Sequence, residues 1–164
     1  MRTADGGFLQ AEVTSCGLNG GPLRGEGEYQ ARIACNLWSK DGVARYDRRF
    51  DKKAHPFFTQ AGKDREGSGD QYIANMRDGS AAGFKYFDFH GAGRIAVQYR
   101  GQATGRIEVS TKPDFSGLCA SVEIRPSVER SWEEAMLDVP GGVKPLYFRF
   151  KGEGAVDFHR FRLS

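Results

Sequence analysis

Residues 94–125 read RIAVQYRGQATGRIEVSTKPDFSGLCASVEIR, and apolar side chains recur at every second position in three parts of this stretch. In the first part Ile95, Val97 and Tyr99 share one face, opposite polar neighbours. Because side chains of a strand point alternately to its two faces, this period predicts strands with one buried and one solvated face. The other two parts carry Ile107 and Val109, and then Leu118, Ala120, Val122 and Ile124.

The alternation continues toward the C-terminus. Leu146, Phe148 and Phe150 again lie two positions apart. In residues 155–163 the apolar positions change parity halfway along the segment. We therefore predict a β-bulge near His159, because a bulge absorbs the one extra residue that the change of parity requires.

Composition agrees with a chain made of strands and turns. Aromatic residues make up 12% of the sequence, and glycine occurs 22 times. A chain of 164 residues fits one domain. We predict a single all-β domain over residues 1–164, a β-sandwich of the jelly-roll type with two antiparallel sheets. Residues 1–7 are interpreted as the remnant of a linker to an upstream domain.

The first half of the chain is less regular. Residues 7–13, 28–37 and 83–89 are each predicted to form a strand. Residues 39–71 are polar and glycine-rich, and a loop of this length is uncommon unless it carries function, contains short strands or packs against a partner. Residues 128–136, VERSWEEAM, come nearest to an amphipathic helix but form too short a segment to predict one.

Charge and cysteine content exclude several classes of protein. The net charge of +3 is spread along the chain, so neither nucleic acid nor a membrane surface is an expected partner. The sequence contains no run of about 18 apolar residues, so it predicts no membrane-spanning helix. Cys16, Cys35 and Cys119 form no CxxC pair, so zinc is not expected. One disulfide is possible in an exported protein, and the sequence leaves both the pairing and the compartment open.

No catalytic constellation stands out in the sequence. The three histidines do not fall in a Ser-His-Asp or Cys-His arrangement, and HExxH, P-loop and EF-hand motifs are missing. Three carboxylates fall on the polar sides of predicted strands, where solvated structural residues are expected. We predict no catalytic residues and disfavour a free-standing hydrolase. The residues concerned are His55, His90 and His159, and Glu108, Glu123 and Asp138.

Several segments, in their order along the chain, resemble a carbohydrate-binding module of family 6. The resemblance implies a sandwich that binds polysaccharide and is not itself catalytic. The segments are FLQAEV (8–13), QYIANM (71–76) with GFKYFDF (83–89), IAVQYRGQATGRIEVS (95–110), SWEEAMLDV (131–139) and PLYFRFKGEGAVDFHRFRL (145–163).

Residues 12–37 and 72–89 further resemble the C-terminal portion of family 43 glycoside hydrolases, in which such a sandwich follows a catalytic propeller. This implies a module that brings a xylosidase or arabinofuranosidase-type enzyme to xylan or arabinoxylan, with its catalytic domain upstream. If that enzyme is exported, the compartment is extracellular or periplasmic. The alternative is a structural domain that packs against the propeller and binds little sugar, which the long 39–71 segment and Ala155 favour.

The resemblance assigns two aromatic ligand-binding residues. Tyr72 and Trp132 match the two rings that grip a sugar in a cleft at the loop end of the family's sandwich. A rigid aromatic plane suits the C–H face of a pyranose. Ala155 stands where the family usually has an asparagine, so this cleft lacks one hydrogen-bonding group. The family's other site, on the concave face of a sheet, stays open as an alternative.

The resemblance also implies a structural calcium ion. Gln10, Glu12 and Asp157 match the family's side-chain ligands, which backbone carbonyl oxygens complete. Calcium favours six to eight oxygen ligands of this kind. The ion would join the first strand to the last.

Overall fold

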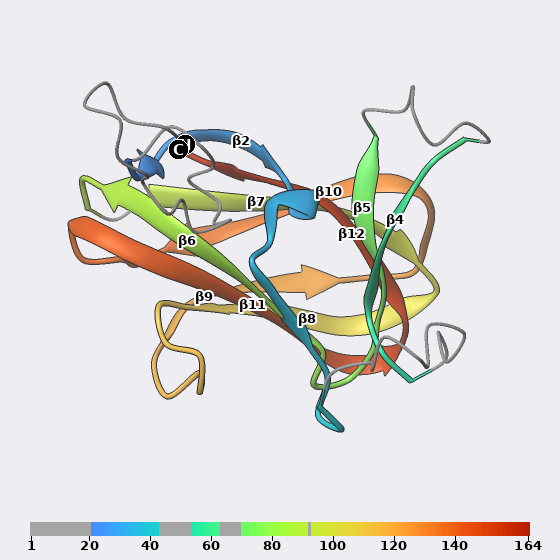
Figure 1. Ribbon diagram of the computed structural model, residues 1–164. Coiled ribbons are helices and arrows are strands. Elements are labelled where there is room, and N and C mark those ends of the chain that lie inside the picture. The colour runs from blue at the N-terminus through green and yellow to red at the C-terminus, as the bar shows by residue number, and fades with distance from the viewer. Residues whose placement is uncertain (1–20, 43–53, 63–69, 92) are drawn as a thin grey trace, which may run out of the picture.

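The computed structural model describes residues 21–42, 54–62, 70–91 and 93–164, and nearly all of its regular structure is β-strand (Figure 1). The strands of these ranges form two layers that pack face to face, as predicted for a β-sandwich. The strands are β1 Leu23–Arg24, β2 Gly27–Gln30, β3 Asn36–Trp38, β4 Phe57–Gln60, β5 Gln71–Met76, β6 Ala81–Phe89, β7 Gly93–Gly101, β8 Ala103–Ser110, β9 Leu118–Ile124, β10 Ser127–Leu137, β11 Gly142–Gly154 and β12 Val156–Leu163.

Each layer is a six-stranded sheet in the described part of the chain. The first sheet has the order β1-β6-β11-β8-β9, and β3 also pairs with β6. The second sheet has the order β10-β7-β12-β5-β4, and β2 also pairs with β12. All pairs are antiparallel except β1 with β6. The chain crosses repeatedly between the sheets, as expected for the jelly-roll type.

The core fills the space between the two sheets with the side chains that the alternation predicted to be buried. Ile95, Val97 and Tyr99 on β7 are at most 1% exposed. Phe161 lies at the centre, with its ring 4.9 Å from that of Phe148. Edge-on and tilted ring pairs of this kind are favourable in addition to the apolar area they bury.

The predicted bulge in the last strand is confirmed. The pairing of β12 with β7 shifts register between Phe158 and Arg160, which leaves His159 as the extra residue. The bulge keeps Phe158 and Phe161 in the core although they are three positions apart. It also places the His159 side chain on the outer side of the second sheet, where Tyr72 lies.

Residues 28–37 do not form the single strand that was predicted. The chain pairs with β12 of the second sheet as β2, makes one 3-10 turn at Ala31–Ile33, and pairs with β6 of the first sheet as β3. A crossing between sheets needs a break in the strand, and the fully buried Ala31 makes this break part of the core. Residues 128–136 form most of strand β10 instead of a helix.

Two solvation predictions on β8 and β9 were wrong. Leu118 was expected to point inward but is 49% exposed, because the pairing shifts register between Val109 and Ser110 at the strand end where Leu118 lies. Glu108 was expected to be solvated but is 4% exposed. Burial is tolerated because Arg149 and Arg106 both pair with its carboxylate.

The described residues include only some of the other segments for which the sequence made predictions. The 39–71 segment contains β4, which pairs with β5 along the edge of the second sheet. The strand predicted at residues 7–13, the linker interpretation of residues 1–7, and Cys16 lie outside the described residues. Cys119 is a free thiol. Within the ranges above, no helix is long and apolar enough to cross a membrane.

Candidate functional site

The two predicted sugar-binding rings lie on the outer face of the same sheet. Tyr72 is on β5 and Trp132 is on β10, with β7 and β12 between these strands. Three strand spacings correspond to about 14 Å. Two rings that hold a sugar between them must be about 7–8 Å apart, twice a van der Waals contact. The structure therefore does not bring these residues together as a two-ring clamp, and their individual roles stay predictions.

Tyr72 is packed into a local cluster. Its side chain is 8% exposed, and its ring stacks on His159 with centroids 4.2 Å apart. Arg100 donates a hydrogen bond from Nη2 to the Tyr72 hydroxyl at 2.9 Å, and its guanidinium lies 5.3 Å from the ring centroid. One ring face and the hydroxyl are thus already in use by neighbours.

His159 occupies an unusual position for a histidine. It is 1% exposed, and neither ring nitrogen has a hydrogen-bond partner among the described atoms. Arg130 on β10 forms an ion pair with Asp70, the residue before β5, so this pair spans the two strands β7 and β12 that lie between β10 and β5. Burial, with Arg130 and Arg100 nearby, lowers the pKa of His159 to about 4, although Asp157 and Asp70 act in the opposite direction.

A row of side chains crosses the sheet beside Trp132. Gln30 on β2 pairs with Arg160 on β12, Arg160 pairs with Gln98 on β7, and Gln98 pairs with Trp132 on β10. Directly paired residues project to the same face, so these four side chains form one line on the outer surface, the Trp132 row. Trp132 is half-buried, and the guanidinium of Arg162 lies 4.8 Å from its ring centroid.

Polar groups surround the Trp132 row. Glu28 accepts hydrogen bonds from Arg160 and Arg162, each at 2.9 Å, and these two bonds lower the pKa of Glu28. The side-chain oxygens of Gln30 and Gln98 are buried and have no hydrogen-bond partner among the described atoms. An amide oxygen in this state is energetically unfavourable, so a ligand hydroxyl that reaches it gains a hydrogen bond that the protein leaves unmade.

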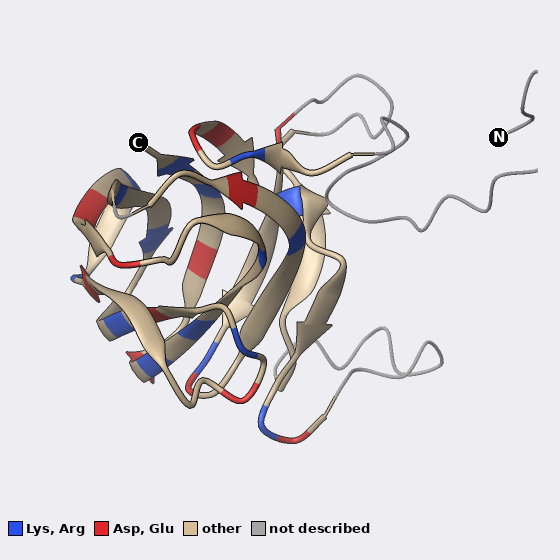
Figure 2. Ribbon diagram, turned by 90° about the vertical axis from the view of Figure 1, so that its left-hand side faces the viewer, with Lys and Arg blue, Asp and Glu red and all other residues tan. Residues whose placement is uncertain are grey.

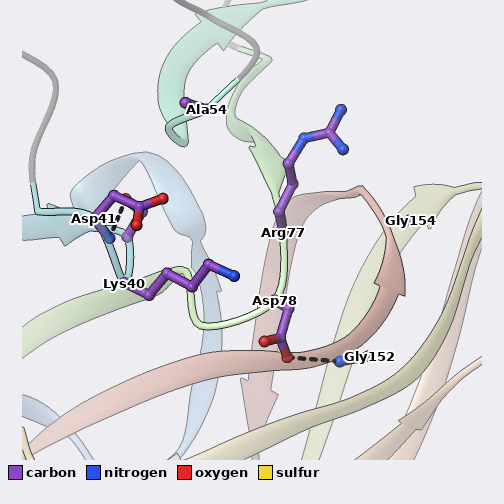
Figure 3. A pocket seen from close by; sticks show the side chains of 8 residues that line it. Lys40, Asp41, Ala54, Arg77, Asp78, Gly152 and Gly154 are labelled. Atoms are coloured by element: carbon purple, nitrogen blue, oxygen red, sulfur yellow. Dashed lines mark hydrogen bonds between the residues drawn. The ribbon is translucent and has the colours of Figure 1, made fainter.

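The rim of the sandwich carries a pocket of a different character (Figure 3). Its volume is ≈ 280 Å³, and Lys40, Asp41, Arg77 and Asp78 supply charged side chains to its wall. Figure 3 shows Lys40 reaching toward Asp78, which accepts a hydrogen bond from the Gly152 amide at 3.2 Å.

This rim pocket is at the end of the sandwich where the resemblance put the sugar cleft. Ala155 follows Gly154, which lines the pocket, whereas Tyr72 lies near the opposite end of β5 from Arg77. Trp132 pairs with Gln98, in the middle of β7. The described lining of the pocket holds no aromatic ring. The expected clamp of Tyr72 and Trp132 at the rim is therefore not formed, because both rings belong to the sheet face.

The predicted calcium ligands are only partly described. Gln10 and Glu12 lie outside the described residues. Asp157 accepts a hydrogen bond from the Asn75 amide at 3.1 Å and pairs with Arg100 at 3.2 Å. Asp157 thus has partners at both carboxylate oxygens within the described residues, and the calcium site of Gln10, Glu12 and Asp157 stays a prediction. In the described ranges no group of three or more His, Cys, Asp or Glu could hold a metal ion.

Comparison with known proteins gives one relative of clear sequence similarity. No family model matches the sequence. The chain is 38% identical over 166 residues to a xylosidase/arabinosidase of Thermoclostridium stercorarium, and the match includes 97% of this chain. The chain spans 34% of that relative's length.

Solved structures match the fold closely. CsCBM6-3 from Clostridium stercorarium, in complex with cellobiose, has a TM-score of 0.68 at 17% identity, over 88% of this chain and 98% of that one. A family 6 carbohydrate-binding module from Clostridium cellulolyticum, in complex with xylose, has a TM-score of 0.67 at 13% identity, over 87% and 99%. The chain has the fold of a family 6 carbohydrate-binding module. The two modules are matched over nearly their whole lengths, so the likeness extends to the entire sandwich.

The same module fold occurs within a larger enzyme. A family 43 arabinoxylan arabinofuranohydrolase from Bacillus subtilis, in complex with cellotetraose, matches with a TM-score of 0.65 at 17% identity. The match covers 100% of this chain and 32% of the enzyme. A family 36 module solved with calcium and xylotriose is a more distant match, with a TM-score of 0.56 at 6% identity.

The sequence contained only part of the information needed to find the Trp132 row. The parity of β7 places Gln98 on the face opposite Ile95 and Val97, and this can be read from the alternation. That Gln98 pairs with Trp132 and Arg160 depends on the order and register of strands distant in sequence. Strand alternation carries no information about partners, so Gln30, Gln98 and Arg160 were missed.

Proposed function

We propose that this module binds polysaccharide on the outer face of its second sheet, with Trp132 as the stacking platform. The observation that carries the proposal is the Trp132 row, which sets an indole ring beside two amides and a guanidinium on a sheet face. This combination suits a sugar, which presents C–H groups on its ring faces and hydroxyls around its edge.

Residues of the Trp132 row and its polar surroundings have distinct roles in the proposed complex. The Trp132 ring provides dispersion contact to a pyranose face at low entropic cost. Arg162 and Glu28 hold the surroundings of the ring in place before the sugar arrives, which reduces the ordering cost of binding. Gln98 and Arg160 hydrogen-bond hydroxyls on either side, after the Gln98 amide turns to meet the ligand.

The relatives support the choice of ligand class. The relative of clear sequence similarity is named a xylosidase/arabinosidase, and solved modules of this fold are in complex with xylose and cellobiose. We infer that xylan or arabinoxylan is the polysaccharide bound here. We also infer that the module serves a longer enzyme of which it forms about a third, and that the catalytic residues lie in the remainder.

Calorimetric titration with xylo-oligosaccharides tests the proposal. Replacement Trp132→Ala removes the stacking plane and is expected to weaken binding at least tenfold, which corresponds to about 1.4 kcal/mol. Met136→Ala is the matched control. Met136 lies four residues after Trp132 on the same face of β10 and is 66% exposed. If Trp132→Ala bound the oligosaccharide as tightly as the unaltered chain, Trp132 would not be the stacking residue.

A second role is contact with another domain of the longer enzyme. Strand β10 is an edge of the second sheet, and it exposes Val128 at 78% and Met136 at 66%. The unpaired backbone groups along such an edge strand favour pairing with another protein segment. Thermal unfolding of the full-length enzyme tests this role, since Val128→Asp together with Met136→Asp would lower its melting temperature but not that of the module alone.

Calcium was predicted to join the first and last strands through Gln10, Glu12 and Asp157. The ion pair of Asp157 with Arg100 and the hydrogen bond that it accepts from the Asn75 amide favour an arrangement without the ion. We propose that Arg100 supplies the positive charge at Asp157, and that the fold does not depend on calcium.

A further inference from the structure

A second pocket lies on the outer side of the first sheet, away from the Trp132 row. Its volume is ≈ 350 Å³. It adjoins the rim pocket of Figure 3, since Lys40 and Asp78 line both. Trp38 and Phe115 supply its aromatic wall. Neither residue was singled out in the sequence.

The aromatic wall belongs to a small cluster that is separate from the main core. Ala81, Phe115 and Tyr147 are buried together, and Trp38 packs against them. The Trp38 and Tyr147 rings meet edge to face with centroids 6.2 Å apart. A side chain at Gly83 would come within 2.8 Å of the Tyr147 ring, so this ring lies close over the backbone of β6. The ring of Trp38 is therefore held in place from below while it lines the pocket.

The polar wall is equally well fixed. Glu108, only 4% exposed, accepts hydrogen bonds from Arg149 Nε at 3.0 Å and Nη2 at 2.6 Å. The Arg149 guanidinium also lies 4.1 Å from the centroid of the Phe115 ring. These contacts fix a cationic hydrogen-bond donor at the pocket, since an arginine held in this way has little freedom left to lose.

The remaining wall alternates donors and acceptors. Lys151 pairs with Asp78 at 2.9 Å, and Asp114 is exposed at the rim of the pocket. Lys40 is exposed, and no ion pair within the described ranges involves it. Arg149 shares the Glu108 carboxylate with Arg106, so the wall presents lysine and arginine donors beside the carboxylates of Asp78 and Asp114. Hydroxyl groups both donate and accept hydrogen bonds, so a wall of closely spaced donors and acceptors suits a molecule rich in hydroxyls.

We propose that this pocket is a second saccharide-binding site, with Trp38 as its stacking plane and Lys40, Asp78 and Asp114 as its hydroxyl-binding groups. The proposal rests on the proposed function for the kind of ligand and on its own geometry for the place. The two sites lie on opposite sheets, so one module can bind two chains or two parts of one branched chain. Such bivalent binding raises the retention of the module on insoluble polysaccharide without any additional contact at either site.

The two tryptophans of the chain allow each site to be observed separately. The variant Trp132→Phe leaves Trp38 as the only indole, and Trp38→Phe leaves only Trp132. Each is titrated with xylohexaose while its tryptophan emission is recorded. The proposal expects a saturable change in the emission of Trp38. Adding Lys40→Ala to the Trp132→Phe variant should weaken that response about tenfold, because a hydrogen bond from a charged donor is lost.

Lys112→Ala is the charge-matched control, because Lys112 is exposed on the same loop as Asp114 but does not line the pocket. It should leave the response of Trp38 unchanged. If the emission of Trp38 does not change while that of Trp132 does, the proposed second site is wrong, and the pocket would instead serve contact with another domain. If Trp38 responds and Trp132 stays silent, the pocket stands and the Trp132 platform is wrong. Silence of both would overturn both, and a Trp38 response insensitive to Lys40→Ala would overturn the pocket assignment.

Discussion

His159 is the residue whose environment departs most from the ordinary. It is almost fully buried and stacked on Tyr72. The nearby charges of Arg130 and Arg100 lower its pKa, and those of Asp157 and Asp70 raise it. Burial without a hydrogen-bond partner favours the neutral ring, which lowers its pKa to about 4 from the ordinary value of 6.5. The unfolded chain therefore binds a proton at a pH where the folded chain does not.

The linkage predicts a loss of stability in mild acid. His159 contributes its full stability above pH 6.5, and this contribution declines as the pH falls through the window from 6.5 to 4. Between pH 7 and pH 5 the free energy of unfolding should fall by about 2 kcal/mol. Urea unfolding at the two pH values measures this change.

His159→Phe provides the control for that measurement, because it keeps a ring against Tyr72 and removes the titrating group. The variant should show a much smaller difference between pH 7 and pH 5. Asp70, whose pKa the Arg130 ion pair lowers, titrates below this window and so does not produce the same signature. An unchanged pH dependence in the variant would mean that His159 is protonated as easily in the folded chain as in the unfolded one.

At the scale of single elements, the strands themselves were predictable. Alternation showed which side chains enter the core in β7 and β11 and, apart from Leu118, in β8 and β9, and the change of parity in β12 predicted its bulge. The crossing at residues 28–37 was missed because apolar residues continue through it. Alternation there cannot distinguish one strand from two strands in different sheets.

The candidate site was predictable only in part for a related reason. Trp132 could be selected as a ring in a resembling segment, but its neighbours come from β2, β7 and β12. Tyr72 lies three strands away from it because of the strand order, which alternation does not specify. Trp38 sits in a three-residue strand that carries no clear alternation of its own.

Strands β8 and β11 approach each other closely at a glycine pair. Gly105 is directly opposite Gly152, and a Cβ at Gly105 would lie 2.2 Å from the carbonyl oxygen of Lys151. Gly105 also has a φ of 156°, outside the range that other residues favour. This pairing therefore requires glycine on both strands.

Gly105→Ala should lower the free energy of unfolding by about 2–4 kcal/mol, since the strands must move apart or the backbone must change conformation. Gly117→Ala is the matched control in the neighbouring loop, because a Cβ there meets nothing within 4 Å. Its effect should stay within about 1 kcal/mol. Chemical denaturation of both variants tests the prediction, and similar stabilities would show that the β8–β11 pairing tolerates a side chain.

At the scale of the whole molecule, the charged residues support binding of a neutral ligand. Figure 2 shows Lys and Arg interspersed with Asp and Glu along the strands, without a large surface of one sign in that view. Much of this charge is locally paired, as in Glu28 with Arg160 and Arg162. Sugar binding that relies on stacking and neutral hydroxyls should accordingly change little between low and physiological salt.

Removal of calcium tests how the last strand is held. Because Arg100 neutralises Asp157, the melting temperature should be the same in EDTA and in millimolar calcium. Arg100→Gln should lower the melting temperature in both buffers, since it leaves Asp157 without its cation. A rise of several degrees on adding calcium to the unaltered chain would contradict this account and restore the ligand set of Gln10, Glu12 and Asp157.

The most direct test of the central claim is a map of amide chemical shifts during titration with xylohexaose. Polysaccharide binding on the outer face of the second sheet predicts that the largest shifts belong to β7, β10 and the C-terminal half of β12, together with the indole N–H of Trp132. Shifts confined to the rim around Arg77 and Asp78, with the indole of Trp132 unmoved, would contradict it.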